Sequence, residues 1–245
     1  MSSASARAIP PDIVFHPPRL PSTFDDGAAL PVDKPAGKTS FDVVRAVRRA
    51  SGQRKVGHAG TLDPMATGLL LILVARPATR LQEAFMNLRK VYRGTLRLGE
   101  TTPSHDAETE VVERTDASGV SNAALESVRR RFEGTINQVP PMYSALKVGG
   151  ERLYEKARRG EHVDRPPRQV TVDRFEFLGR DGADVSFEVV CSKGTYIRSL
   201  ARDVGAELDV GAHLVRLRRT AIGPFQVDDA WTIERLRTAM SSGAS

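Results

Sequence analysis

The sequence predicts an α+β fold in which helices flank a mixed, mainly antiparallel sheet. Segments whose apolar residues alternate, as in half-buried strands, are interspersed with segments of helical period. These segments follow no regular strand-helix-strand order, and the chain contains no internal repeat. With 245 residues, 40% of them hydrophobic, the chain is long enough to bury a sizeable core.

The first half of the chain predicts regular elements on both sides of a glycine- and proline-rich loop. A short strand and a turn lead into a capped amphipathic helix, and a strand that is apolar at every position follows the loop. The expected elements are a strand at 28–32, a turn at 34–37, a helix capped by Thr39 or Ser40 and ended by Gly52, and a buried strand at 69–74.

The second half begins with an alternating segment, residues 90–98, which predicts a half-buried strand. Tyr92, Gly94, Leu96 and Leu98 lie on one face of it. The other expected elements are a helix from Ser121 that ends at Gly134, a hairpin of strands 170–177 and 185–191, a helix with Ile197, Leu200, Val204 and Leu208 on one face, and a short helix at 231–237.

Changes in composition predict the domain organisation. Residues 1–27 are rich in proline and serine, so we expect a flexible N-terminal tail, followed by one domain over residues 28–245. Within this domain, residues 140–168 carry many cations and two tyrosines but have no hydrophobic period. We expect this insertion to be mobile and to close over a charged, flat ligand; the alternative is a tolerated surface loop.

Composition also restricts the compartment. No apolar run approaches the ~20 residues that span a bilayer, and the N-terminus lacks the apolar core of a signal peptide. We therefore expect a cytoplasmic protein without membrane contact. The single cysteine, Cys191, excludes an internal disulfide, and its apolar neighbours predict a buried thiol on a strand.

The formal charge of +6 permits a polyanionic partner. Basic residues gather in three clusters, each of which alone would be typical of a solvated face. The clusters are residues 45–55, 155–168 and 215–220. Because the first adjoins the unusual loop, we expect a nucleic-acid partner.

The loop at 55–68 carries polar side chains that could perform chemistry. Asp63 lies in a turn, where most aspartates are structural because the carboxylate bonds the nearby backbone. A cation such as Lys193 or Arg198 would keep an exposed carboxylate ionised, which makes Asp63 a candidate nucleophile. His58 could be a base, a stacking ring or a loop brace. Neither metal-ligand spacing nor a glycine-rich nucleotide motif is present, so we expect no metal and no nucleotide cofactor.

Six segments together resemble one family. GHAGTLDPMATGLLLI resembles the catalytic motif of the TruB family of pseudouridine synthases. Five further segments resemble family segments in the family's order, from about Ala28 to the C-terminus. They are VDKPAGKTSFDVV, KVYRGTLRLGETT, VPPMYSALKVGGERLYEKARRG, CSKGTYIRSLARDVG and GAHLVRLRRTAIGPF.

The resemblance implies roles for the matching residues. Asp63 matches the nucleophilic aspartate, Tyr92 the tyrosine that stacks on the flipped uracil, and Arg198 the arginine that pairs with the aspartate. His58 matches a histidine that fills the space left by the flipped bases. The other residues expected to contact substrate or RNA are Lys34, Pro35, Gly60, Thr61, Asp106, Arg158, Arg159, Lys193, Tyr196 and Leu217.

The resemblance also implies the reaction. Family members convert the uridine at position 55 in the T-loop of tRNA to pseudouridine, by flipping the base, breaking the C1′–N1 bond and rejoining the uracil through C5. This chemistry needs no metal, cofactor or nucleoside triphosphate. We expect a monomer whose partner is the T-arm of tRNA.

Two features depart from the family pattern. Many members continue into a C-terminal RNA-binding domain, which we do not expect in this chain. Where many relatives carry an Asp-Ala-Asp-Gly turn, this chain has Asp106-Ala107-Glu108-Thr109.

Two other functions remain open from the residues alone. A non-catalytic RNA-binding or RNA-folding protein would share the basic clusters but would not need Asp63. A carboxylate-nucleophile hydrolase of small molecules would need Asp63 but not a cationic insertion. An assay for pseudouridine on a T-arm hairpin separates these possibilities.

Overall fold

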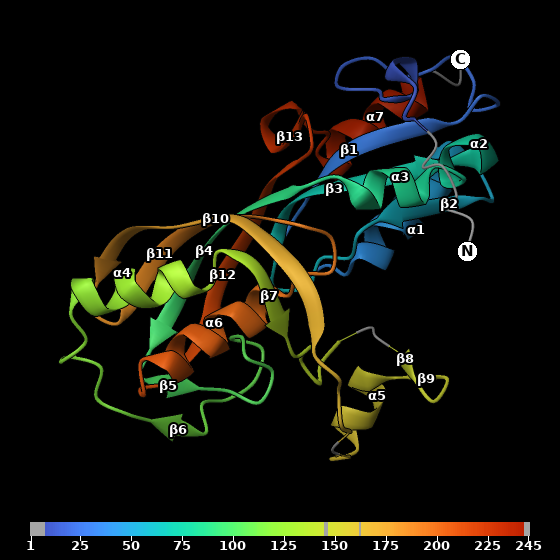
Figure 1. Ribbon diagram of the computed structural model, residues 1–245. Coiled ribbons are helices and arrows are strands. Elements are labelled where there is room, and N and C mark those ends of the chain that lie inside the picture. The colour runs from blue at the N-terminus through green and yellow to red at the C-terminus, as the bar shows by residue number, and fades with distance from the viewer. Residues whose placement is uncertain (1–7, 145–146, 162, 243–245) are drawn as a thin grey trace. The chain divides into compact units, whose positions relative to one another are not determined.

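Figure 1 shows the computed structural model, which describes residues 8–144, 147–161 and 163–242. Of residues 147, 148, 152, 154, 157 and 158 only the backbone is described. The chain divides into unit 1, Met1–Tyr92 with Arg218–Ser245, and unit 2, Arg93–Leu217. Strands β4 (Lys90–Leu98) and β12 (Ala212–Ile222) each begin in one unit and end in the other.

Unit 1 is built around strand β3 (Thr67–Val74). This strand pairs antiparallel with β1 (Ala28–Lys34) and β2 (Val56–Ala59), and parallel with β12 through two residue pairs. Strand β13 (Phe225–Gln226) pairs antiparallel with β12. The sheet is therefore mixed and mainly antiparallel, as the sequence predicts.

Both faces of β3 are buried, which explains its unbroken apolar run. Leu69, Leu71 and Leu73 pack in one cluster with residues of α2 (Ala75–Thr79) and α3 (Gln82–Asn87). Leu70, Ile72 and Val74 pack in a second cluster with residues of α1 (Ser40–Ser51) and α7 (Ile233–Ser242). Since successive side chains of a strand point to opposite faces, a strand between two layers of helices is apolar throughout.

Helix α1 begins and ends where the sequence predicts. Thr39 accepts the Asp42 amide while the Asp42 carboxylate accepts the Thr39 amide, which forms a capping box. Gly52 ends the helix with φ +66°, a left-handed conformation that glycine adopts readily.

The N-terminal segment differs from the flexible tail that its composition predicts. A 3-10 turn, η1 (Pro11–Ile13), buries Ile13, and Phe15 donates its amide to the Ala29 carbonyl at 3.0 Å. The Trp231 indole N–H donates to the Phe15 carbonyl at 2.9 Å. Residues 8–27 are thus part of unit 1, because their few apolar side chains find partners there, while residues 1–7 lie outside the described part of the chain.

Unit 2 contains β7 (Gly134–Gln138), β10 (Arg168–Asp181) and β11 (Asp184–Cys191), in the strand order β12-β4-β11-β10-β7. The predicted hairpin is confirmed as the antiparallel pair β10 and β11, and Cys191 is fully buried as expected. Helices α4 (Asn122–Arg131) and α6 (Ile197–Glu207) contact each other beside these strands (Figure 1).

The remaining elements are short. β5 (Glu100–Thr101) pairs with β6 (Glu113–Arg114), and η2 (Val227–Asp229) precedes α7. In the insertion, β8 (Lys147–Val148) and β9 (Glu151–Arg152) form a hairpin that leads into α5 (Leu153–Arg158), where Leu153 is buried. None of the helices in the described ranges is both long and apolar enough to span a bilayer.

Candidate active site

The loop predicted at residues 55–68 is shorter in the structure, where residues 60–66 join β2 to β3 in unit 1. The two strands are paired antiparallel, from Val56↔Val74 to Ala59↔Leu71. His58 therefore lies in a strand, and not in the loop as its sequence predicts, because β2 pairs with β3 up to Ala59. Within the loop, Thr61 is exposed and Asp63 is half-buried.

Gly68 is required where the loop meets β3. Its φ is +103°, and a Cβ at this position would lie 2.3 Å from the Arg219 carbonyl oxygen. An L-residue would thus clash with the neighbouring strand, so the close approach of β12 to β3 depends on glycine. The backbone turns at Asp63, whose carbonyl accepts the Ala66 amide at 3.1 Å.

Ser40 holds the loop from the first turn of α1. Its Oγ accepts the Leu62 amide at 2.8 Å and donates to the Leu62 carbonyl at 3.1 Å. Ser40 is 2% exposed, so both bonds are shielded from water. The sequence indicates Ser40 only as a helix cap, and this second role has no local signal because Leu62 is distant along the chain.

Lys34 holds the other side of Asp63. Its Nζ donates to the carbonyls of Pro35 at 3.0 Å, Lys38 at 2.5 Å and Pro64 at 3.2 Å, and the residue is fully buried. The three donors of this buried ammonium are directed at carbonyls, and the expected contact of Lys34 with RNA stays a prediction. Lys34 braces the loop, while Pro35 beside it is exposed.

A third brace comes from Arg219, which the sequence shows only as a member of a basic cluster. Nε donates to the Leu69 carbonyl at 2.7 Å, Nη2 to the Gly60 carbonyl at 3.1 Å, and Nη1 to Tyr92 Oη at a longer 3.4 Å. The residue is 1% exposed. The alternation of a strand could have indicated that Arg219 is buried, since Leu217, Arg219 and Ala221 lie on one face and alternate with more exposed residues.

The cluster at 215–220 is therefore not a continuous cationic face. Arg219 is buried, and Arg218 makes two hydrogen bonds to the Asp33 carboxylate at 3.0 and 2.8 Å. Arg219 is thus withdrawn from the surface, whereas the Arg218 side chain is 40% exposed and shares its charge with Asp33, so its expected place on an RNA surface stays a prediction.

Tyr92 and His58 lie on strands of the same unit. Tyr92 is 8% exposed on β4, and the guanidinium carbon of Arg219 lies 5.9 Å from its ring centroid. Burial, and secondarily the positive charge of Arg219, lower the pKa of His58 below its usual 6.5. The imidazole is therefore neutral at neutral pH, which suits a ring that packs against other groups.

Arg198 begins a second constellation, which lies in unit 2. It is the second residue of α6 and is 4% exposed. Nη1 donates to the Ser104 carbonyl at 3.1 Å and Nη2 to the Tyr143 carbonyl at 2.8 Å, while Nε lies 3.4 Å from Asp106 Oδ2. The expected pair of Arg198 with Asp63 joins residues of different units and stays a prediction.

Asp106 organises the turn that departs from the family pattern. Its Oδ1 accepts the Ser104 hydroxyl at 2.5 Å and the Glu108 amide at 3.0 Å, and Thr109 Oγ1 accepts the Ser104 amide at 3.1 Å. Asp106 is 1% exposed. The carboxylate is thus enclosed beside Arg198, and its expected contact with RNA stays a prediction.

The other predicted residues of unit 2 lie in different surroundings. Tyr196 precedes α6, where its amide donates to Gln138 Oε1 at 2.7 Å and its carbonyl accepts Gln138 Nε2 at 3.0 Å. Gln138, buried at the end of β7, carries no signal in the sequence. Leu217 is 8% exposed on β12, whereas Lys193 is exposed.

The insertion neutralises part of its own charge. Arg159 is exposed and makes ion pairs with Glu151 at 2.5 Å and with Glu161 at 2.7 Å. The side chain of Arg158, the other predicted RNA contact in this segment, lies outside the described part of the structure.

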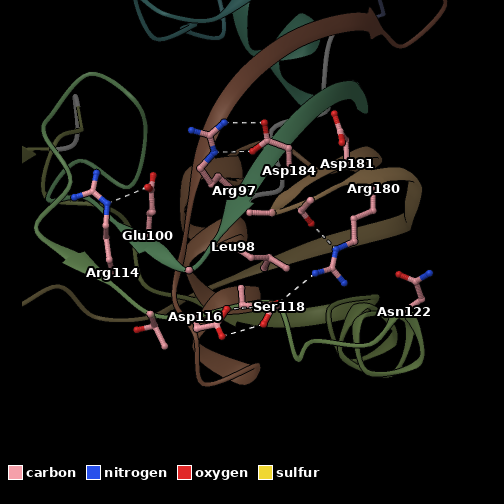
Figure 2. A pocket seen from close by; sticks show the side chains of 15 residues that line it. Arg97, Leu98, Glu100, Arg114, Asp116, Ser118, Asn122, Arg180, Asp181 and Asp184 are labelled. Atoms are coloured by element: carbon pink, nitrogen blue, oxygen red, sulfur yellow. Dashed lines mark hydrogen bonds and ion pairs between the residues drawn. The ribbon is translucent and has the colours of Figure 1, made fainter.

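A cavity of about 900 Å³ in unit 2 contains none of the predicted site residues (Figure 2). Its arginines are engaged within the protein: Arg97 with Asp184 at 2.7 and 2.8 Å, Arg114 with Glu100 at 3.2 Å, and Arg180 with the carbonyls of Gly182, Ala117 and Val120. With further carboxylates at Asp116 and Asp181, this lining does not suit a phosphate. Among the described residues, no group of three or more His, Cys, Asp or Glu side chains could hold a metal ion.

Comparison with known proteins gives matches over most of the chain. Residues 48–197 match the model of the TruB family pseudouridylate synthase N-terminal domain. Residues 198–244, for which we expect no separate domain, match the model of the tRNA pseudouridylate synthase B C-terminal domain.

A relative and two solved structures agree with these matches. The tRNA pseudouridine synthase B of Thermobifida fusca (strain YX) is 52% identical over 219 residues, which cover 86% of this chain and 74% of that protein. A chain in the crystal structure of a Cbf5-Nop10-Gar1 complex is 30% identical, with a TM-score of 0.68 over 96% of this chain and 67% of that one. A chain of the archaeal box H/ACA sRNP Nop10-Cbf5 complex is 29% identical, with a TM-score of 0.65. The match covers 94% of this chain and 60% of that chain. The chain therefore belongs to the TruB family of pseudouridylate synthases.

Proposed function

We propose that this enzyme converts the uridine at position 55 in the T-loop of tRNA to pseudouridine, with Asp63 as the essential carboxylate. Relatives that are about half identical to it carry the name tRNA pseudouridine synthase B, which supports tRNA as the substrate. The observation that carries the proposal is the bracing of Asp63, since Ser40 bonds the residue before it and Lys34 the residue after it. A carboxylate on a fixed backbone can meet an extruded nucleotide at constant geometry.

The reaction needs only what the chain can supply. The C1′–N1 bond breaks and a C1′–C5 bond forms, while C5 loses a proton and N1 gains one, so the composition of the nucleotide is unchanged. The Asp63 carboxylate attacks C1′, attacks C6, or assists elimination of the base to a glycal. All three routes require an ionised carboxylate next to the sugar and a pocket that retains the freed base.

The target base must leave the stack of the T-loop, at a cost of a few kcal/mol. We propose that Tyr92 offsets part of this free-energy cost by stacking on the flipped uracil. The contact of its hydroxyl with Arg219 fixes the ring. The neutral ring of His58 is proposed to occupy space that the flipped bases leave.

The α1 ridge, which we define as Phe41, Arg45 and Arg49, is the proposed RNA contact surface of unit 1. These residues recur every four positions, so they lie on one exposed face of α1. Phe41 is 56% exposed, and the Arg45 guanidinium lies 5.7 Å from its ring centroid. Because α1 starts at the serine that holds Leu62, the ridge begins beside the catalytic loop. An exposed aromatic ring followed by two arginines on the same helix face suits a base and its neighbouring phosphates.

The insertion, residues 140–168, is proposed to be mobile without RNA and ordered with it. Its other buried residues, Pro140, Pro141, Met142 and Ser144, lie at its start, and among the described side chains of residues 147–168 only Leu153 is buried, which is little apolar burial for that length. Hydrogen exchange on the free and the RNA-bound protein tests this, and protection in the free protein equal to that of β3 contradicts it.

We further propose that the enzyme acts as a monomer in the cytoplasm.

The test of the proposed function uses a T-arm hairpin and a full tRNA transcript, each labelled with tritium at uridine C5. Wild type should release tritium, and a substrate with cytidine at position 55 should release none. Asp63→Asn should lose on the order of 10⁴ or more in rate while binding RNA within a few-fold of wild type. An inactive wild type contradicts the function and is what a non-catalytic RNA-binding protein would give. An Asp63→Asn variant that keeps more than about a tenth of the wild-type rate contradicts the role of Asp63.

A further inference from the structure

We propose that Arg219 is a positioning residue, which fixes the base-stacking ring of Tyr92 to the catalytic loop so that the two keep one geometry. The inference rests on the proposed function, because it concerns how the flipped uracil is held relative to Asp63. It extends that function to a residue that none of the comparisons assigns.

The contacts of the guanidinium carry the inference. Its three nitrogens donate in three directions, to the carbonyl at the start of the loop (Gly60, 3.1 Å), to the strand after the loop (Leu69, 2.7 Å) and to the hydroxyl of Tyr92 (3.4 Å). The planar guanidinium holds its donors in a rigid fork, so one side chain keeps the three acceptors in fixed relative directions, which the compact, rotatable ammonium of a lysine does not do. A displacement of Tyr92 relative to the loop would break at least one of these bonds.

The burial of Arg219 without a recorded ion pair in the described part of the chain is energetically costly, which favours a role beyond stabilising the fold. Its acceptors are two carbonyls and a hydroxyl, and within the described residues the structure records no ion pair for it, although it is only 1% exposed. Buried cations are normally paired with a carboxylate, because an uncompensated charge in the interior is costly. The neighbouring residue on the same strand, Arg218, does have such a partner in Asp33.

A second group near the loop responds to this charge. The positive charge of Arg219 adds to burial in lowering the pKa of His58, so the guanidinium acts on His58 as well as on Gly60 and Tyr92. Arg219 thus contacts the loop at Gly60 and the ring of Tyr92 through its hydroxyl, and its charge lowers the pKa of His58. All three groups lie in unit 1.

The experiment compares Arg219→Lys with Arg218→Lys, a matched control on the adjacent position of β12 that keeps its charge near Asp33. Each variant is first checked for a cooperative melt, and then assayed on the T-arm hairpin under single-turnover conditions. Arg219→Lys should lower the single-turnover rate at least tenfold, with the enzyme concentration for half-maximal rate within threefold of wild type, and Arg218→Lys should stay within twofold in rate.

A double-mutant cycle with Tyr92→Phe separates positioning from general packing. Tyr92→Phe keeps the ring and removes the acceptor, so it should lower the rate at least threefold alone. Added to Arg219→Lys, it should lower the rate by less than a further twofold, because the same contact is already lost. A merely structural arginine would not couple to this hydroxyl.

The outcomes are distinct. An inactive wild type means that the proposed function has failed, whereas an active wild type with normal Arg219→Lys turnover overturns only this inference. Effects that multiply in the cycle overturn it as well. If Arg219→Lys does not fold, Tyr92→Phe alone decides, and an unchanged rate for that variant overturns the inference.

Discussion

Ser40 and Leu62 are joined by two hydrogen bonds, in which the serine hydroxyl accepts the leucine amide and donates to the leucine carbonyl. A single side chain on α1 thereby satisfies both backbone groups of the residue before Asp63. The position of the carboxylate consequently depends on a hydroxyl that never meets the substrate.

Ser40→Ala should therefore affect both stability and rate. Two buried backbone groups lose their partner, which lowers the free energy of unfolding by about 1–3 kcal/mol. Displacement of the loop should lower the single-turnover rate by about tenfold or more. Urea unfolding and kinetics measure both. The control is Ser118→Ala, since Ser118 Oγ donates to the Asp116 carboxylate at 2.9 Å on the exposed surface of unit 2; equal effects of the two variants would contradict the bracing role.

The ion pair of Arg198 with Asp106 gives a prediction for unit 2. Both residues are almost fully buried, so Asp106→Asn removes a buried counter-charge and should lower the free energy of unfolding by about 3 kcal/mol. Asp184→Asn breaks a comparable pair with Arg97 whose side chains are 33% and 40% exposed, and should lower it by less than about 1 kcal/mol. Urea unfolding of both variants at one pH tests the contrast, and a larger loss for Asp184→Asn would refute it.

His105 predicts an acid-sensitive stability. Burial, and then the charges of Arg202, Arg198 and Arg165, lower its pKa from 6.5 to about 4. Between these values the unfolded chain binds a proton that the folded chain does not bind. The free energy of unfolding should therefore fall as pH falls from about 6.5 to 4, by up to about 3 kcal/mol from this group.

His105→Asn should remove this component. Asparagine tolerates the positive φ of 61° at this position, so the backbone need not change. Urea unfolding of wild type and variant at several pH values isolates the histidine, because the carboxylates titrate in both proteins. If the free energies of unfolding of wild type and variant run parallel between about pH 6.5 and 4, His105 does not contribute to the loss of stability in acid.

The α1 ridge predicts a change in binding without a change in chemistry. Phe41→Ala should raise KM about fivefold or more while kcat stays within twofold, since stacking of one base on an aromatic ring contributes about 1–3 kcal/mol. Leu178→Ala is the control, because Leu178 is 54% exposed on unit 2, close to the 56% of Phe41. An equal rise in KM for both variants would mean that general surface hydrophobicity is responsible.

The sequence predicts the elements whose signal is local. The apolar run of β3, the caps of α1 and the hairpin of β10 and β11 each follow from neighbouring residues. Strand β12 is missed because its arginines conceal the alternation, and β2 because it is short and lies within a glycine-rich segment.

The site is predictable in its chemistry but not in its support. Asp63 and Tyr92 stand in segments that resemble family motifs, whereas Arg219 acts through Gly60 and Leu69, which are about 150 or more positions away. Lys34 and Asp106 are expected as substrate or RNA contacts from the family resemblance, and only tertiary contacts show that both are buried and brace the backbone.

The division of unit 1 into two separate stretches of the chain governs how the protein can fold during synthesis. Residues 93–217 leave the ribosome before Trp231 and Leu236, which complete the cluster around Leu70, Ile72 and Val74. The apolar strand β3 therefore lacks part of its packing partners while the whole of unit 2 is synthesised. The nascent chain exposes this apolar strand until residue 236 has left the ribosome, so chaperone binding and aggregation should concentrate on β3 in that interval.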